Sequence, residues 1–162
     1  MPSTTLMQAP NVAWVSTWNA RCGVASYSSF LTSQIPSQRL TILANYTEER
    51  TQKDADNVRR CWNASVTEDM EYAFETIIDA ECKLVVIQYN FGFFSLDTMS
   101  VLIHKLKQQN IHVHIFFHAT ADVMWGEQKV SLELIAKDLQ MADRLYVHSV
   151  DDLNRLKKIG LV

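Results

Sequence analysis

Short apolar runs alternate along the chain with longer segments in which apolar residues recur at helical spacing. Five runs are almost continuously apolar rather than strictly alternating, at residues 12–16, 40–44, 84–89, 111–118 and 144–148. Strands in a parallel sheet have this pattern, because helices cover the sheet on both faces. The runs therefore predict the strands of a parallel sheet.

Helical patterns fill the intervals, at residues 23–34, 68–81, 96–109 and 130–141. Thr67 is the expected N-cap of the second of these helices. A last helix is expected to begin at Ser149, which has capping-box spacing to Asp152, although Asp replaces the usual Glu or Gln. Gly160 is expected to end it.

Strands that alternate with helices predict right-handed βαβ units. The expected fold class is α/β, with a doubly wound, Rossmann-like parallel sheet flanked by helices in three layers. The polar stretch 46–57 predicts an exposed loop, and 58–62 predicts a short edge strand after it. The 162 residues suit one domain, 1–162, with a sizeable core.

Composition narrows the class of protein. The net charge of −3 argues against a general nucleic-acid binder, which normally carries a basic face. Three separated cysteines, Cys22, Cys61 and Cys82, favour neither a disulfide framework nor a zinc site, and fit a reducing compartment. No signal peptide is evident in residues 1–10, and no run approaches the ~20 apolar residues of a membrane span. We expect a cytoplasmic protein, and peripheral contact with the inner face of a membrane stays open.

Ligands of open α/β sheets bind outside the carboxyl ends of the strands. The segments that follow four predicted strands are rich in polar and aromatic groups, at residues 17–23, 88–92, 118–122 and 148–149. Plain connecting loops rarely share this composition. These segments therefore contain the candidate site residues.

Gly23 lies where the first strand turns into a helix. A glycine there permits close backbone approach, and the free N–H groups of a helix start favour an anion. Arg21 beside it suits a phosphate or carboxylate. Cys22 is an ordinary thiol whose pKa a helix start would lower. The alternative is a tight turn with a solvated arginine, since one glycine falls short of the G-x-G-x-x-G fingerprint and no Walker A pattern is present.

His118 ends a predicted strand at the same edge. It suits a hydrogen bond to a sugar hydroxyl or proton transfer near neutral pH. The alternative is a structural histidine bonded to a backbone carbonyl. His112 and His114 share its face of the strand, but His112 lies ~20 Å from His118. They cannot hold one ion together, so we expect no metal site.

Three polar residues follow the most strand-like run, namely Gln88, Tyr89 and Asn90. Their amide and hydroxyl groups suit a sugar or nucleotide. The alternative is that they satisfy the exposed ends of the strand. His148 is expected to cap the last strand, and the alternative is a contact with a ligand or with a second domain.

Four segments resemble a known family. Residues 18–27 (WNARCGVASY) look like the first loop and helix of bacterial glycosyltransferases with the GT-B fold, in the broad glycosyltransferase family 4 class. Residues 86–92 (VIQYNFG) resemble their fourth-strand motif, and 115–120 (IFFHAT) the segment that ends in a histidine. Residues 146–149 (YVHS), followed by Asp152, Leu153 and Leu156, are similar to the stretch before the interdomain linker. The matches run in the family's order.

The resemblance implies the acceptor-side, N-terminal domain of a retaining enzyme without a bound metal or cofactor. Its partners would be a nucleotide-sugar donor, held mainly by a C-terminal domain with a glutamate pair, and a glycan or lipid-linked acceptor. Gly23 would lie near the donor phosphates or the acceptor, and His118 near the transferred sugar. The remaining residues expected to bind substrate are Arg21, Cys22, Gln88, Tyr89, Asn90, Thr120 and His148.

The chain stops at Val162, where the family continues into the linker and the donor domain. We therefore expect no appreciable transferase activity from the chain alone. Two other classes compete with this interpretation. One is a non-catalytic α/β binding or interaction module, and the other is a small nucleotide-binding or flavodoxin-like protein, which the lone glycine in the first loop weakens.

Overall fold

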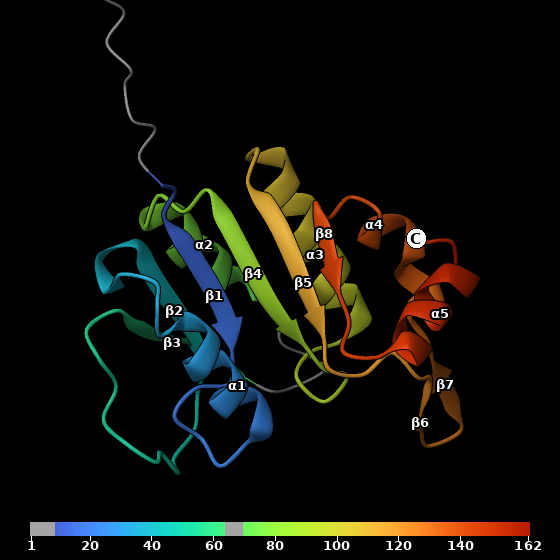
Figure 1. Cartoon of the computed structure of the whole chain (residues 1–162), viewed down its shortest axis with the longest axis horizontal. Helices are drawn as coiled ribbons and strands as arrows, with labels where there is room; N and C mark the ends of the chain where they lie inside the picture. Colours follow the sequence, from blue (N-terminus) through green and yellow to red (C-terminus); the bar gives the residue numbers. More distant parts are fainter. Residues whose placement is uncertain (1–8, 64–69) are drawn as a thin grey trace, which may run out of the picture.

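The computed structural model describes residues 9–63 and 70–162. Its centre is a six-stranded parallel sheet in the order β3-β2-β1-β4-β5-β8 (Figure 1). The strands are β1 (Val12–Ser16), β2 (Leu40–Asn45), β3 (Val58–Trp62), β4 (Leu84–Tyr89), β5 (His112–Phe117) and β8 (Arg144–Tyr146). This is the doubly wound Rossmann order, and the strand order reverses between β1 and β4.

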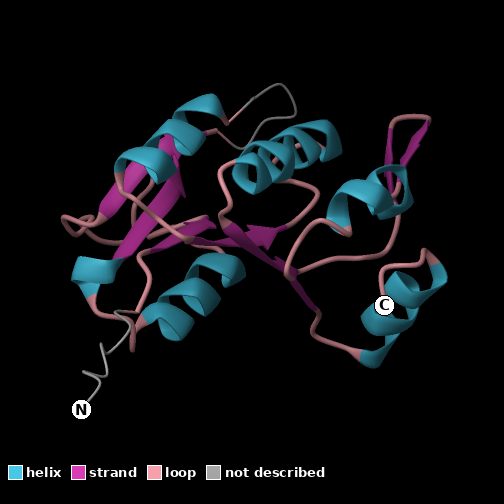
Figure 2. Ribbon diagram, turned by 90° about the horizontal axis from the view of Figure 1, so that it is seen from above, coloured by secondary structure: helices cyan, strands magenta, loops and turns pink. Residues whose placement is uncertain are grey.

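Helices cover both faces of the sheet, which gives the expected three layers (Figure 2). Helix α1 (Gly23–Thr32) lies on one face. Helices α2 (Glu71–Asp79), α3 (Leu96–Gln108) and α4 (Ala136–Leu139) lie on the other. Helix α5 (Val150–Lys158) packs at the β8 end of the sheet, where Leu156 is buried in the core. The predicted Rossmann-like fold is confirmed.

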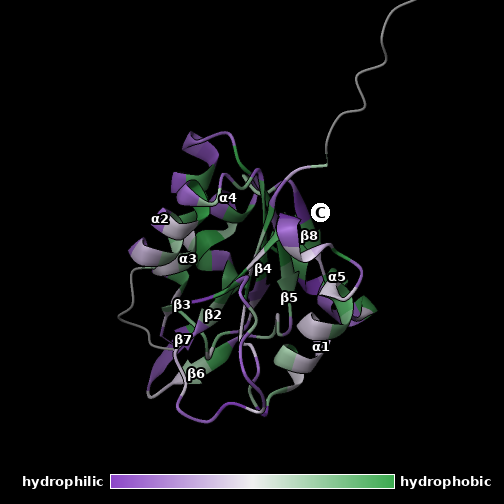
Figure 3. Cartoon of the chain, turned by 90° about the vertical axis from the view of Figure 1, so that its left-hand side faces the viewer, coloured by the Kyte–Doolittle hydropathy of each residue, from purple (hydrophilic) through white to green (hydrophobic). Residues whose placement is uncertain are grey.

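The strand predictions held because alternate side chains of each strand enter two separate cores. Trp14 and Ile42 belong to the smaller core beneath α1, whereas Val15, Ile87 and Ile115 belong to the larger core under α2, α3 and α4. Figure 3 shows the apolar colour concentrated between the layers. The segment 58–62 is an edge strand as predicted, and 46–57 is the loop before it.

Local caps explain several helix boundaries. The Ser149 hydroxyl accepts a hydrogen bond from the Asp152 N–H at 3.1 Å, as the capping pattern predicted. Gly160 follows α5 with φ of +77°, a conformation that suits a residue without a side chain. Helix α2 begins after Met70, whose φ is +56°. The expected cap Thr67 lies outside the described residues.

One predicted helix is wrong. Residues 130–141 do not form one helix, because Val130 ends a hairpin of β6 (Val123–Trp125) and β7 (Gln128–Val130). A 3-10 helix, η2 (Leu132–Ile135), then leads into the short α4. Gly126, with φ of +63°, stands in the two-residue turn of the hairpin. Among the described helices, none has the length and apolar character needed to cross a membrane.

Candidate functional site

Four side chains meet at the carboxyl edge of the sheet, on the face that α1 covers. They are Gln88 at the end of β4, His118 after β5, His148 after β8 and Tyr27 of α1, and we call them the histidine cluster. The Tyr27 ring meets both imidazoles edge-on, with centroids 5.2 Å from each. The two imidazoles lie 4.9 Å apart. Three residues predicted from the sequence are therefore brought together, and Tyr27 joins them.

His118 is fixed by two hydrogen bonds to β4. Its backbone N–H donates to the Tyr89 carbonyl at 2.9 Å, which extends the β4–β5 pairing by one residue. Its Nε2 lies 2.7 Å from Oε1 of Gln88. Since an amide oxygen only accepts, Nε2 of His118 carries the proton and Nδ1 is left as the acceptor. The Gln88 side chain is fully buried, and its Nε2 has no partner among the described residues.

The cluster keeps His118 uncharged. Burial of the ring, with a smaller contribution from the nearby His148, lowers the pKa of His118 to about 4. Neutral imidazole is therefore the form present at physiological pH. A neutral ring offers one donor and one acceptor, which matches a hydroxyl group better than it matches a carboxylate or phosphate.

The start of α1 forms the neighbouring part of the edge. Burial opposes a charged thiolate at Cys22, but hydrogen bonds from Thr17 and from the backbone of Ala25 and Val24 outweigh it and lower the pKa of the thiol. Gly23 is exposed, its φ is ordinary, and an added Cβ would meet no atom within 4 Å. The fold itself does not need a glycine here. Arg21 is exposed beside it.

A partly buried ion pair stabilises this edge and was not foreseen from the sequence. Arg60 of β3 donates two hydrogen bonds of 2.9 Å to the carboxylate of Asp54. Asp54 in turn accepts a bond of 2.8 Å from Asn19, whose φ is +49°. The loop 46–57 is thereby tied to the turn after β1. No local sequence pattern signals this contact, because Asn19 and Asp54 lie 35 residues apart in the chain.

Two predicted residues point elsewhere. Tyr89 lies on the opposite face of the sheet, only 1% exposed, in an aromatic group with Phe91, Phe94 and Phe117. Asn90 closes a turn, since its Oδ1 accepts the Gly92 N–H at 3.0 Å. The structure thus separates both from the histidine cluster.

Thr120 is also committed to a structural contact. Its hydroxyl donates to Asp152 at 2.5 Å and accepts from Arg155 at 3.3 Å, so that it holds the first turn of α5 against the sheet edge. The side chain is buried. Thr120 therefore sets the position of α5, and hence that of the preceding His148.

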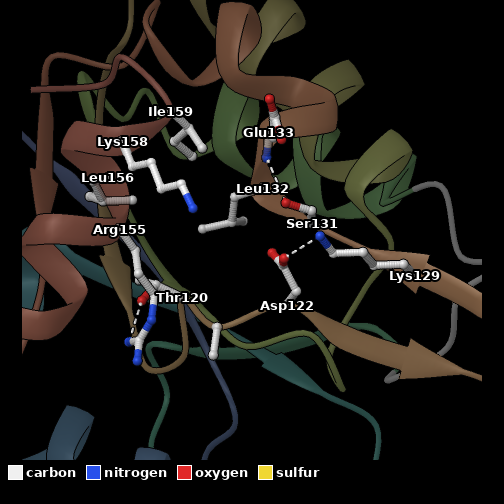
Figure 4. A pocket seen from close by; sticks show the side chains of 11 residues that line it. Thr120, Asp122, Lys129, Ser131, Leu132, Glu133, Arg155, Leu156, Lys158 and Ile159 are labelled. Atoms are coloured by element: carbon white, nitrogen blue, oxygen red, sulfur yellow. Dashed lines mark hydrogen bonds and ion pairs between the residues drawn. The ribbon is translucent and has the colours of Figure 1, made fainter.

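A cavity of about 280 Å³ lies between α5 and the β6–β7 hairpin (Figure 4). Lys158 extends into it from α5, and Asp122 pairs with Lys129 at 2.7 Å on the hairpin side. Arg155 is engaged by Asp152 at 3.0 Å. Acidic and basic groups thus largely compensate each other, and the cavity has no clear preference for one sign of charge.

Metal ligation is not supported within residues 9–63 and 70–162, where no group of three or more His, Cys, Asp or Glu side chains is placed to hold an ion. His112, at the far end of β5, instead lies 3.1 Å from Asp143. Comparison with known proteins adds no family: no protein-family model matches the chain, and no curated protein matches it in sequence.

Proposed function

We propose that the chain is the N-terminal, acceptor-side domain of a retaining GT-B glycosyltransferase, which transfers a sugar from a nucleotide-sugar donor to a glycan or lipid-linked acceptor. The observation that carries the proposal is the meeting of Gln88, His118 and Tyr27 beside the start of α1, near the point where the strand order reverses. If the chain belongs to the family that it resembles, Gly23 and His118 have to lie at this edge of the sheet.

His118 and the start of α1 have complementary chemistry. A neutral His118, oriented by Gln88, can accept a hydrogen bond from a sugar hydroxyl through Nδ1. The exposed Gly23, where an added Cβ would meet nothing within 4 Å, leaves room for a phosphate to approach the start of α1. In this account the donor is bound mainly by a second domain, and the present domain orients the sugar and receives the acceptor.

The test uses the protein expressed from the complete reading frame that encodes this chain. Radiolabelled nucleotide sugars are supplied with membrane and polysaccharide fractions, with and without EDTA, and the anomeric configuration of the product is determined by NMR. We expect EDTA-resistant transfer with retention, and no steady transfer by the 162-residue chain alone. Absence of transfer from every common nucleotide sugar, or steady transfer by the chain alone, would contradict the proposal.

One observation favours a second candidate, a non-catalytic binding module. The partner of His118 is an amide rather than a carboxylate, and the lowered pKa, about 4, places the ring far from the range in which a proton carrier works at neutral pH. A module that binds glycans without reacting would have these properties as well. The same assay separates the two, because such a module would bind sugar in the complete protein without transferring it.

A further inference from the structure

A groove beside α1 has a composition unlike that of the other cavities. It has a volume of about 380 Å³ and lies between α1 and the loop 46–57. Its lining consists of Asn19, Ala20, Ala25, Ser26, Ser29, Phe30, Thr51 and Gln52. None of these side chains is charged, whereas five charged side chains line the cavity beside α5.

The helix side of the groove combines hydroxyl groups with an aromatic ring. Ser26, Ser29 and Phe30 fall on one stripe of α1, at the spacing that places residues of successive turns side by side. Phe30 is 80% exposed and takes no part in either core. Its ring is therefore open to contact from the groove.

The loop side of the groove is held in place before any ligand arrives. The Thr51 N–H donates to the Asn19 carbonyl at 2.7 Å, and Nε2 of Gln52 donates to Oδ1 of Asn19 at 2.8 Å. Asp54, which is paired with Arg60, accepts a hydrogen bond from Asn19 and thereby fixes its position. A preformed wall lowers the ordering cost of binding.

Groups that recognise hydroxyls remain available on both sides. The hydroxyls of Ser29 and Thr51 make no hydrogen bond with any part of the chain that the structure describes. Oε1 of Gln52 is likewise not used by the bond that its Nε2 makes to Asn19. Neutral donors and acceptors that surround an exposed aromatic ring match a ligand with many hydroxyls and an apolar C–H face. Uncharged saccharides have both features.

We infer that this groove is a binding subsite for an uncharged sugar residue, with the ring of Phe30 against the C–H face of the sugar. The inference rests on the proposed function. Ser26 precedes Tyr27 in α1, so a glycan in the groove lies on the side of the helix adjacent to the side that faces the histidine cluster. An acceptor bound there would extend toward the start of α1.

The experiment is a ¹⁵N-HSQC titration of the 162-residue chain with methyl glycosides of glucose, galactose, mannose and N-acetylglucosamine. At least one glycoside should shift the amides of Ser29, Phe30 and Thr51, with saturation at millimolar concentration, as expected for a single sugar unit (Kd of about 1–10 mM). Phe30→Leu should weaken this binding about fivefold, the typical value of one aromatic contact. Tyr72→Leu removes another exposed aromatic side chain, on α2, and should leave the affinity unchanged.

The inference is overturned if no glycoside shifts the groove amides up to ~50 mM, if the shifts lie elsewhere, or if Phe30→Leu binds as tightly as the unchanged chain. These outcomes are distinct from failure of the proposed function. Transfer by the complete protein without binding in the groove would remove the subsite alone. Binding in the groove without transfer would leave the subsite and remove the transferase.

Discussion

Gln88 lies in β4 and His118 directly follows the neighbouring β5, and their side chains form a hydrogen bond of 2.7 Å on the face of the sheet that α1 covers. The bond makes Gln88 the residue that selects the tautomer of His118. It also leaves the ring without an acidic partner among the described residues.

Gln88→Glu should raise the pKa of His118 from about 4 toward its ordinary value of 6.5, because a carboxylate at the same place favours the charged ring. An NMR titration of the His118 ring protons measures this. Gln88→Leu should leave the pKa low but remove the preference for the proton on Nε2, which ¹⁵N shifts of the ring report. An unchanged pKa in Gln88→Glu would show that the two side chains do not interact in solution.

His118 should also make stability depend on pH. Its pKa in the folded chain, about 4, is below the ordinary 6.5, so the unfolded chain binds the proton more readily between these values. Stability should therefore fall as the pH is lowered from 6.5 to 4, by roughly 1–2 kcal/mol after allowance for solvent screening of the partly buried ring. Urea unfolding at several pH values measures the loss. His118→Gln should be less sensitive by that amount, and equal slopes for both chains would refute this prediction.

Arg60→Ala should destabilise the domain by about 2 kcal/mol, because it leaves the carboxylate of Asp54 partly buried without its main partner. Arg60→Lys should not restore the loss, since lysine cannot reproduce the two-pronged contact. Chemical denaturation gives the values. Arg59→Ala alters an exposed neighbour and serves as the control. Equal losses of stability in Arg59→Ala and Arg60→Ala would mean that the ion pair of Arg60 and Asp54 contributes nothing to stability.

Gly23→Ala separates folding from binding. The added methyl group meets nothing within 4 Å and the backbone is unstrained, so stability should be unchanged or rise by about 0.5 kcal/mol. Sugar transfer by the complete protein should nevertheless fall, because the methyl group projects where a phosphate would approach. Thermal unfolding and the transfer assay measure the two effects. A stable variant with full transfer would exclude close approach at Gly23.

Cys22 should be the reactive thiol. Its pKa is lowered, whereas burial raises the pKa of Cys61 to about 12 and that of Cys82 to about 11. Iodoacetamide should alkylate Cys22 about tenfold faster than the others in the folded chain, as peptide mass mapping would show. Thr17→Val should slow the reaction by removing a hydrogen bond to the thiolate. Comparable rates at all three cysteines would contradict this.

The sheet was predictable because its information is local. The runs 12–16 and 84–89 are strands with the expected bounds, since each is long enough to cross a core that is covered on both faces. The hairpin was missed because its strands have three residues each, too few for a periodic pattern, and because Val130 fits a helical stripe equally well.

The site was predictable only in part. The rule that ligands bind at the carboxyl edge selected His118, Gln88 and His148, but it could not tell which face each side chain would take. Tyr89 follows Gln88 directly and therefore enters the opposite core. Tyr27 was missed, although its place four residues after Gly23, on the same side of the helix, was a usable signal. The bond between Asp54 and Asn19 joins distant residues, and only the fold reveals it.

The most direct test of the account compares His112, the first residue of β5, with His118, which follows β5, in the complete protein. His118→Ala removes the ring at the carboxyl edge, and His112→Ala removes an exposed ring at the opposite end of β5. The rate of sugar transfer from the nucleotide-sugar donor should fall about 100-fold in His118→Ala and stay unchanged in His112→Ala. Equal rates for His118→Ala and the unchanged protein would contradict the account.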